Sequence, residues 1–352
     1  MSVRQEFLDT FGEIVDVLEA EMGAQGLALP PEAIARVRRC AEYNVPHGKL
    51  NRGLAVVECY RAFRGAHSVQ ALGARERQDA YWLGWCVEWL QAFFLVADDI
   101  MDGSKTRRGR TCYYLLDKIG LDAVNDALLL EAHIYRLLRQ RFRGRADDAE
   151  LHADLVDIFQ EVTFHTELGQ MLDLTCQAGG QVDLSRFTEE TLHRIYRFKT
   201  CMYSFYLPVA LGMRLAGERD PQRYRQAEAI LVEMGKFFQA QDDYLDCFGD
   251  PAVTGKIGTD IEENKCTWPV VEALKRMSDE QRAVLAANYA RRDADCVERV
   301  KQLYREVGIP EAFPAYETQS YQALQQQIEQ LRPEMPVGAL EFLLNKIYKR
   351  SK

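Results

Sequence analysis

The chain has 352 residues, of which 47% are hydrophobic and 28% are charged, a composition that excludes a disordered chain and provides for a sizeable core. Its formal net charge of −9 argues against general nucleic-acid binding, which requires a broad basic field. The nine cysteines include no Cys-x-x-Cys pair, so we expect neither a disulfide framework nor a zinc site.

Both ends of the chain favour a cytoplasmic protein. The first helix-like segment is rich in carboxylates, which argues against a signal peptide and a transit peptide. These carboxylates are Glu6, Asp9, Glu13, Asp16, Glu19 and Glu21. The most apolar run, Ala92 to Ala97, is much shorter than the roughly 18 residues needed to cross a bilayer. The final Arg-Ser-Lys differs from the Ser-Lys-Leu peroxisomal address.

Apolar residues recur every three to four positions along almost the whole chain, which predicts helices. The segment from Phe7 to Leu18 is the first amphipathic helix, and Gln78 to Asp102 is one helix of about 25 residues, apolar on all sides near its C-terminal end. Breaks fall at clusters of Gly, Pro, Asn and Asp, at residues 44–48, 103–109, 177–183, 249–259 and 308–314. We therefore predict an all-α protein: a single large antiparallel helical bundle around a central cavity, forming one domain over residues 1–352.

The long helix ends in an aspartate-rich motif, Asp98-Asp99-Ile100-Met101-Asp102. Asp98 and Asp102 lie one turn apart on the same face, where they repel each other and meet the unfavourable end of the helix dipole. A cation would offset this repulsion, and carboxylates at this spacing suit Mg²⁺, which takes its other ligands from water and phosphate oxygens. For a single motif, the alternative is a solvated acidic helix end.

The same pattern recurs as Asp242-Asp243-Tyr244-Leu245-Asp246 at the end of a second apolar helix, and basic residues follow each copy. Magnesium that bridges carboxylates to a diphosphate, with Lys or Arg on the remaining oxygens, would weaken the bond to a leaving group. Two copies therefore favour a diphosphate-handling site. Residues 249–257 do not form a Walker A loop, because five residues separate the glycines, and Tyr244 stands where a calcium-binding EF-hand needs an oxygen ligand.

With the blocks around them, these motifs resemble the eukaryotic farnesyl diphosphate synthases, short-chain trans-prenyltransferases of the polyprenyl synthase family. The matching blocks are residues 48–53 (Gly-Lys-Leu-Asn-Arg-Gly), 93–109, 169–174, 198–206, 235–265 and 347–352, whereas residues 270–336 carry no motif. The resemblance implies the isoprenoid synthase fold and a head-to-tail 1′-4 condensation of isopentenyl diphosphate with dimethylallyl diphosphate and then geranyl diphosphate. It also implies three magnesium ions per active site, a role in sterol and other isoprenoid lipid biosynthesis, and a homodimer.

The resemblance further implies roles for individual residues. Magnesium would be bound by Asp98, Asp102 and Asp242, with Asp99, Asp243, Asp246 and Asp260 in supporting positions. The allylic diphosphate would be bound by Arg107, Lys199 and Lys256, with Lys265 nearby. Isopentenyl diphosphate would be bound by Lys49, Asn51, Arg52, Gln91, Arg108 and the basic tail through Arg350. The allylic cation would be stabilised by the side-chain oxygens of Thr200, Tyr203 and Gln239, in a cavity whose polar wall includes Gln170 and Asp173, and the departing diphosphate would accept the proton.

Several of these residues also have ordinary structural explanations. Lys199 in an apolar helix is also explained by a long side chain that reaches solvent, and Thr200 and Tyr203 by ordinary helix positions. The arginines after the first motif are also typical of a solvated charge run. The basic residues at the C-terminus are equally typical of a frayed chain end.

Product length is predicted from the helix geometry. Phe94 precedes Asp98 by four residues, so it lies one turn, about 5.4 Å, further along the face that carries the metal ligands. That distance is close to one isoprene unit, so Phe94, with Phe93 beside it, would close the pocket at fifteen carbons. Aromatic residues at both positions are also the pattern of farnesyl producers within the family. The alternative is that both are ordinary core residues.

Three other functions are left open. A class I terpene cyclase shares the first motif, but the second motif here is another Asp-Asp-x-x-Asp, and a cyclase has no use for a second diphosphate site at Lys49 to Arg52. A geranyl or geranylgeranyl diphosphate synthase would use the same chemistry with a different pocket. A non-catalytic metal-binding protein is disfavoured because both motifs are present.

Overall fold

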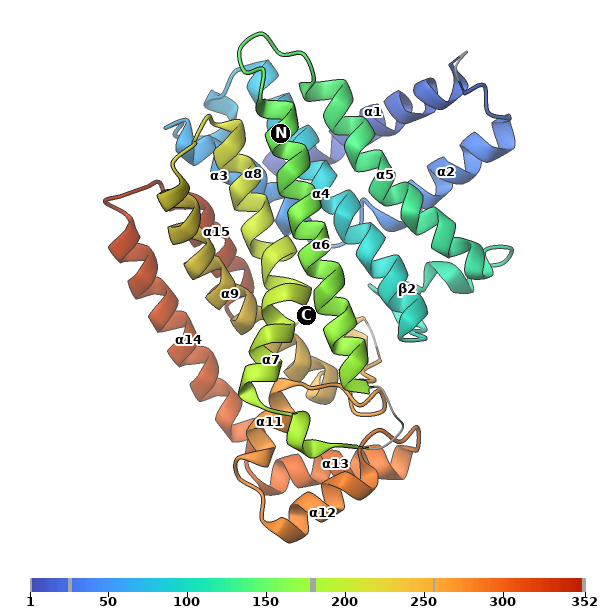
Figure 1. Ribbon diagram of the computed structural model, residues 1–352, viewed down its shortest axis with the longest axis vertical. Helices are drawn as coiled ribbons and strands as arrows, with labels where there is room; N and C mark the ends of the chain where they lie inside the picture. The colour runs from blue at the N-terminus through green and yellow to red at the C-terminus, as the bar shows by residue number, and fades with distance from the viewer. Residues whose placement is uncertain (1, 25–26, 178–181, 256, 350–352) are drawn as a thin grey trace. The chain divides into compact units, whose positions relative to one another are not determined.

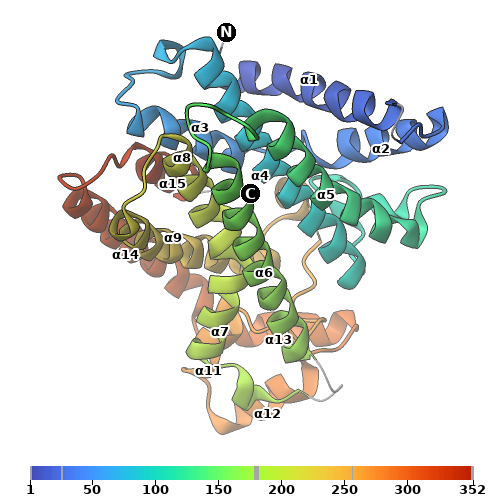
Figure 2. The same cartoon turned by 45° about the horizontal axis from the view of Figure 1, so that its top comes forward.

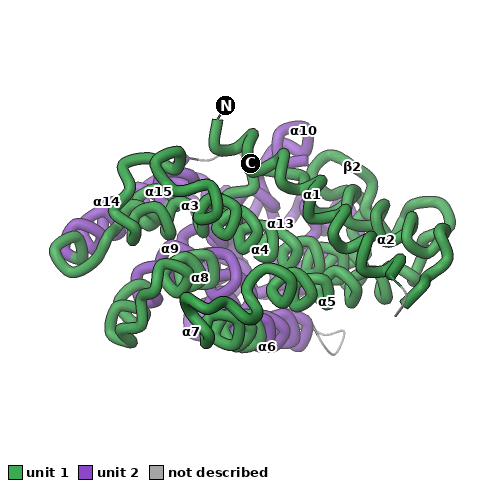
Figure 3. Tube along the Cα trace, turned by 90° about the horizontal axis from the view of Figure 1, so that it is seen from above, with its two compact units in different colours: residues 1–161, 206–227, 331–343 green, residues 162–205, 228–330, 344–352 purple. Residues whose placement is uncertain are grey.

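The computed structural model describes residues 2–24, 27–177, 182–255 and 257–349, and nearly all regular structure in these ranges is helical (Figure 1). The chain divides into two compact units, each assembled from separated segments (Figure 3). Unit 1 contains residues 1–161, 206–227 and 331–343, and unit 2 contains residues 162–205, 228–330 and 344–352. The predicted all-α class is confirmed.

Three helices contribute more than one residue to each of the two units: α6 (Leu151–Gln177), α9 (Pro221–Phe248) and α15 (Gly338–Ile347). The other elements of unit 1 are α1 (Val3–Gly23), α2 (Pro31–Asn44), α3 (Asn51–Phe63), the short 3₁₀ helix η1 (Val69–Ala71), α4 (Ala74–Met101), β1 (Thr106–Arg107), β2 (Arg110–Thr111), the 3₁₀ helices η2 (Tyr113–Leu115) and η3 (Gly120–Asp122), α5 (Ala123–Phe142) and α8 (Leu207–Leu215). Helices α1 and α2 lie side by side (Figure 2).

Helix α4 is the central helix of unit 1 and packs against α3, α5 and α8. It begins four residues before the predicted Gln78, because the Glu76 carboxylate accepts the backbone N–H of Gly73 at 2.8 Å and caps the first turn. Trp85 is fully buried and stacks on Phe7 of α1, with ring centroids 4.4 Å apart. The predicted long helix is confirmed, but its fully buried stretch is residues 79–93, and several residues of its last two turns are partly exposed.

Among the described residues, α4 is also the one helix that is long and apolar enough to cross a membrane. However, 83% of its most apolar stretch is buried inside the protein. Buried core helices pass the same test of length and composition, so packing within unit 1 accounts for the apolar character of α4.

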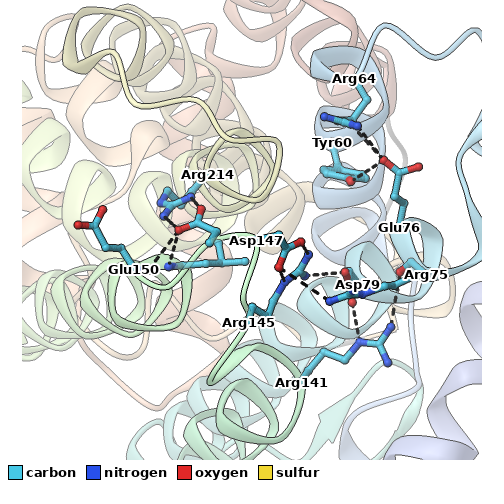
Figure 4. A network of polar contacts seen from close by, with 12 residues as sticks. Tyr60, Arg64, Arg75, Glu76, Asp79, Arg141, Arg145, Asp147, Glu150 and Arg214 are labelled. Atoms are coloured by element: carbon cyan, nitrogen blue, oxygen red, sulfur yellow. Dashed lines mark hydrogen bonds and ion pairs between the residues drawn. The ribbon is translucent and has the colours of Figure 1, made fainter.

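Ion pairs attach the loop between α5 and α6 to the rest of unit 1 (Figure 4). Asp79, a buried carboxylate of α4, binds Arg141 at 2.6 Å and Arg145 at 2.7 Å. Arg214 of α8 is only 4% exposed, and it binds Asp148 at 2.7 Å and Asp154 at 2.5 Å. Because each buried charge has opposite charges beside it, the loop is held on both sides.

The remaining elements lie in unit 2, apart from the last residue of η5 and of α14, which belong to unit 1. These are the 3₁₀ helix η4 (Leu184–Arg186), α7 (Glu189–Tyr196), the π-helix η5 (Arg197–Tyr206), α10 (Pro251–Thr254), α11 (Trp268–Leu274), α12 (Asp279–Asn288), α13 (Ala294–Glu306) and α14 (Ile309–Leu331). Tyr244, inside the second aspartate motif, stacks on Phe313 of α14 with centroids 3.9 Å apart, and Trp268 packs against the same ring. The segment of residues 270–336, which has no sequence motif, thus supports the second motif.

Three of the predicted breaks contain regular structure, and in one of them, residues 249–259, α10 forms a single helical turn. Residues 308–314 are not a loop, because α14 begins at Ile309 and continues through Pro314. Pro314 has no N–H to donate to the carbonyl of Pro310, so the helix lacks one hydrogen bond near its start. Residues 103–109 contain part of a β-hairpin, in which Thr106 pairs with Thr111 and Arg107 with Arg110. Two-residue strands are too short to produce the alternation by which strands are predicted.

Candidate functional site

The first aspartate motif forms the C-terminal end of α4. Asp102 is the C-cap residue, and its N–H donates to the carbonyl of Asp98, one turn before it. The side chains of Asp98 and Asp102 are on one helical face, Asp98 partly exposed and Asp99 buried. Burial raises the pKa of Asp99, while the nearby Arg107 acts in the opposite direction. The predicted one-turn spacing of Asp98 and Asp102 is therefore present in the helix.

The β-hairpin after this motif presents two consecutive arginines. Its central residues, Arg108 and Gly109, have φ of 54° and 73°, the left-handed values that a two-residue hairpin turn requires. Just before the turn, the Arg107 guanidinium donates to Asp99 Oδ1 at 2.6 Å and to Asp98 Oδ2 at 3.1 Å. Arg107 is thus fixed to the first aspartate motif.

Arg108 is directed to another part of unit 1. Its Nη1 lies 3.5 Å from the carbonyl oxygen of Asn44, and a Cβ atom on Gly48 would approach its Nε to 3.0 Å. Lys49 follows Gly48 directly and is exposed. The positive charges of Arg52 and Arg108 both act on Glu88 of α4. The structure therefore brings together Lys49, Arg52 and Arg108, which were predicted to bind one diphosphate, and Asn51 lies between the first two.

Tyr43 was not singled out in the sequence but anchors this hairpin. Its hydroxyl donates to the carbonyl of Thr111 at 2.7 Å, and the Arg110 guanidinium lies 3.8 Å above its ring. A tyrosine at the end of an amphipathic helix carries no functional signal in the sequence, since its partners lie more than sixty positions away.

Two further predicted features lie on α4. Gln91 is buried, and its Oε1 has no hydrogen-bond partner among the described residues. A buried amide without its full set of partners is suited to a polar ligand. Phe93 and Phe94 contact each other with ring centroids 4.8 Å apart, and Phe94 is less buried than Phe93. The pair therefore forms one aromatic block between Gln91 and Asp98.

In unit 2, the predicted residues Lys199, Thr200 and Tyr203 lie in the π-helix η5. Two glycines let neighbouring helices reach its backbone. A Cβ on Gly169 of α6 would be 2.1 Å from the Lys199 nitrogen, and a Cβ on Gly235 of α9 would be 2.5 Å from Cys201 Sγ. Stretches of π-helix occur frequently at functional sites, and here one is held by close contacts with two glycines of neighbouring helices.

A chain of hydrogen bonds connects η5 to the second aspartate motif. Thr200 Oγ1 donates to Gln239 Oε1 at 2.6 Å, and Gln239 Nε2 donates to Asp243 Oδ1 at 2.9 Å. Asp243 also accepts from the Tyr196 hydroxyl and from the backbone N–H of Trp268. Burial raises the pKa of Asp243, and these donors oppose that rise. Asp243 therefore fixes the orientation of the Gln239 amide.

Asp173 lies between two of the predicted lysines. Its Oδ2 is 2.6 Å from Lys199 Nζ and 3.7 Å from Lys265 Nζ. Gln170, one turn before it on α6, is partly buried. Two ammonium groups around one buried carboxylate suit the binding of an anion such as a diphosphate.

The rest of the second motif lies at the end of α9, where Asp242 and Asp246 are partly exposed on one helical face. Asp246 Oδ1 accepts the backbone N–H of Asp260 at 3.2 Å, which ties the following loop to the motif. Lys256 and Arg350 lie outside the described residues.

Among the described residues, no group of three or more His, Cys, Asp or Glu side chains is close enough to hold a metal ion by itself. Mg²⁺ is commonly held by one or two carboxylates and takes its remaining ligands from water and phosphate oxygens. Asp98 and Asp102, and Asp242 and Asp246, supply carboxylate pairs of that kind.

Comparison with known proteins identifies the family of the chain. Residues 34–307 match the family model for polyprenyl synthetase. The chain is 47% identical to farnesyl pyrophosphate synthase of Gallus gallus over 99% of this chain and 93% of that protein, and 44% identical to the Saccharomyces cerevisiae enzyme over 99% and 98%. It superposes on farnesyl diphosphate synthase of T. brucei complexed with risedronate with a TM-score of 0.91 and 33% identity, covering 100% of both chains. The family model, the relatives and the fold agree, so the chain belongs to the polyprenyl synthetase family.

Proposed function

We propose that the protein is a farnesyl diphosphate synthase, which condenses isopentenyl diphosphate with dimethylallyl diphosphate and then with geranyl diphosphate, releasing diphosphate each time. The observation that carries this proposal is the near-complete coverage by farnesyl pyrophosphate synthases at 44–49% identity. The bound risedronate named for the T. brucei relative supports a site for adjacent phosphorus groups.

In the proposed site, Mg²⁺ supplies Lewis-acid stabilisation of the leaving diphosphate, and we assign three ions to it. Asp98, Asp102 and Asp242 are the proposed ligands. Asp99, Asp243 and Asp246 support them, since Asp99 binds Arg107 and Asp243 orients Gln239. Arg107, Lys199, Lys256 and Lys265 bind the allylic diphosphate, and the guanidinium and ammonium groups take up its developing charge.

The second diphosphate is assigned to a separate polar set: Lys49, Asn51, Arg52, Gln91, Arg108 and Arg350. It orients the double bond of isopentenyl diphosphate toward the allylic carbon, so that the new bond forms at a fixed distance. The oxygens of Thr200, Tyr203 and Gln239 stabilise the allylic cation through their dipoles, and Gln170 and Asp173 complete the polar wall. The proton lost in the last step goes to the released diphosphate.

A homodimer is proposed from the surface of α5. Leu121, just before this helix, and Val124 and Leu128 within it are 73%, 50% and 55% exposed, one turn apart along the helix. A continuous exposed apolar stripe suits contact with a second copy of the chain. We also propose a cytoplasmic location and one functional domain over residues 1–352, since α6, α9 and α15 run through both units.

The function is tested by incubating the protein with Mg²⁺, isopentenyl diphosphate and either dimethylallyl or geranyl diphosphate, and reading the product by mass spectrometry. We expect a fifteen-carbon diphosphate from both primers, and loss of turnover with EDTA that added Mg²⁺ restores. A ten- or twenty-carbon product would keep the reaction but reject the assigned length. Hydrocarbon release without consumption of isopentenyl diphosphate would indicate a cyclase.

A matched pair of variants tests the metal ligands. Asp98→Asn should lower kcat by about a hundredfold or more, because it removes a metal-binding charge. Asp295→Asn changes an exposed aspartate in the first turn of α13 and should leave kcat unchanged. Equal activity in the two variants would reject Asp98 as a ligand.

A further inference from the structure

Glu88 is a carboxylate buried inside unit 1 for which the proposed reaction has no role. It lies on α4 and is 3% exposed. A buried carboxylate is costly unless donors surround it, so its partners indicate what it does. Gly53 N–H, at the start of α3, donates to Glu88 Oε1 at 2.8 Å, and the backbone N–H of Arg52 also bonds to this carboxylate.

Helix α3 has no cap of its own. The first amide groups of a helix lack partners within the helix, and a polar side chain at the N-cap usually accepts from them. Here the N-cap residue is Leu50, which is buried and provides no side-chain hydrogen bond. Glu88 therefore replaces the missing cap from a position 35 residues further along the chain.

The segment that Glu88 holds is strained. Leu50 has φ 55° and ψ 29°, a left-handed conformation that is unfavourable for a branched apolar residue, and Gly48 has φ 95°. Strained backbone persists only where the surrounding structure enforces it. Lys49 lies between these two residues, and Asn51 and Arg52 follow them.

A glycine contact sets the distance between the two helices. A Cβ on Gly53 would be 2.9 Å from the Gly84 carbonyl oxygen and 3.1 Å from Glu88 Cγ, and a Cβ on Gly84 would be 2.6 Å from the Gly53 carbonyl oxygen. Backbone contact at this crossing brings the first turn of α3 within reach of Glu88, one turn further along α4.

We infer that Glu88 is a positioning residue for isopentenyl diphosphate: its carboxylate holds the first turn of α3 and, through it, the strained loop that presents Lys49, Asn51 and Arg52. This inference rests on the proposed function. Glu88 occupies the backbone N–H groups of Arg52 and Gly53, which would otherwise attract an anion at the start of α3. The substrate diphosphate is therefore bound by the side chains of Lys49, Asn51 and Arg52. The Glu88 carboxylate also offsets the positive charges of Arg52 and Arg108.

Steady-state kinetics on Glu88→Ala and Glu88→Gln test this role. Glu88→Ala removes the acceptor and should raise KM for isopentenyl diphosphate about tenfold or more, with KM for geranyl diphosphate changed less than about twofold. Glu88→Gln keeps an acceptor oxygen and should restore KM for isopentenyl diphosphate to within about threefold of the wild-type value. Equal changes in both KM values, or none, would overturn the inference.

A matched control separates positioning from general loss of stability. Ser278→Ala removes the cap of α12, where Ser278 Oγ accepts from Gln281 N–H. It should lower the melting temperature without changing KM for isopentenyl diphosphate, and a raised KM in this control would show that any destabilisation has the same effect. If Glu88→Ala does not fold, Glu88→Asp is measured instead, because its shorter side chain moves the carboxylate away from the Gly53 N–H. Its KM for isopentenyl diphosphate should then rise, and an unchanged KM would overturn the inference.

Assaying the wild-type protein distinguishes failure of the Glu88 positioning role from failure of the proposed function. If the wild-type protein forms no fifteen-carbon product, the function is wrong, and binding of isopentenyl diphosphate by calorimetry then tests the positioning role directly. Weaker binding in Glu88→Ala than in Ser278→Ala would uphold it. Equal affinities would overturn it.

Discussion

The Arg107 guanidinium is bound to the buried carboxylate of Asp99, with Nη2 and Nε at 2.6 Å and 2.9 Å from the same oxygen, Oδ1. The middle aspartate of the first motif is thus bound by an arginine eight residues later, and the same guanidinium also reaches Asp98 Oδ2 at 3.1 Å. Arg107 is held at the position from which, in the proposed reaction, it binds the allylic diphosphate.

Replacing Arg107 with Lys tests this arrangement. Lys keeps the positive charge but cannot hold Asp99 and Asp98 together with a planar fork. We expect kcat/KM for geranyl diphosphate to fall about tenfold or more, with KM for isopentenyl diphosphate nearly unchanged. Steady-state kinetics with each substrate varied in turn measure both values, and an equal loss for the two substrates would contradict the assignment.

Replacing Phe94 with Ala should lengthen the product. The aromatic block of Phe93 and Phe94 lies one turn below Asp98, so removing one ring opens about one isoprene unit of length. We expect twenty-carbon product in addition to fifteen-carbon product, by mass spectrometry. Phe164→Ala, at an exposed phenylalanine of α6, is the control. An unchanged product distribution in Phe94→Ala would remove this residue from chain-length control.

Replacing Gly169 with Ala should disturb the π-helix η5. The added Cβ would lie 2.1 Å from the Lys199 nitrogen, so backbone must move, at a cost of about 1–3 kcal/mol, and kcat should fall as Lys199 shifts. Gly12→Ala is the matched control, because nothing lies within 4 Å of its Cβ position in α1, and it should stabilise the protein by about 0.5–1 kcal/mol. Chemical denaturation and kinetics on both variants check the contrast.

Replacing Arg214 with Leu should destabilise unit 1 strongly. This variant removes the buried guanidinium that binds Asp148 and Asp154 (Figure 4 shows the position of Arg214), and losing such hydrogen bonds to charged groups costs about 1.5–3 kcal/mol. Arg219→Ala removes a 51% exposed arginine that pairs with Asp148 and Glu150, so it should cost no more than about 1 kcal/mol. Similar unfolding midpoints for the two variants would show that burial does not set the strength of these pairs.

His133 should make stability depend on pH. It is buried on α5, and burial lowers its pKa from 6.5 to about 4, so the folded protein keeps it neutral. As the pH falls from 6.5 to 4, the unfolded chain takes up a proton that the folded protein does not, which lowers the free energy of unfolding by about 3 kcal/mol. We expect His133→Leu to lose this dependence, whereas His67→Leu, at an exposed histidine, should retain it. Denaturation at several pH values measures the difference.

Much of the site was predictable because its signals are local. Two Asp-Asp-x-x-Asp motifs put carboxylates one turn apart whatever the helix packs against, and Phe94 has a fixed distance from Asp98 for the same reason. The consecutive arginines 107 and 108 were found because the charges lie next to an acidic motif. Their division between two diphosphates came from the family resemblance, whereas the left-handed turn at Arg108 and Gly109, which turns the two side chains toward different partners, was visible only in the structure.

The sequence alone determined the all-helical class, the family and the candidate residues, because apolar periodicity and short motif spacings survive without knowledge of distant partners. Only the tertiary structure decided which of these residues are turned inward and what holds them. Asp243 is bound by Tyr196, 47 residues earlier, Gly53 is bound by Glu88, 35 residues later, and Gly169 lies against Lys199 in another helix. Such contacts form between helix faces that packing brings together, and no spacing within the chain specifies them.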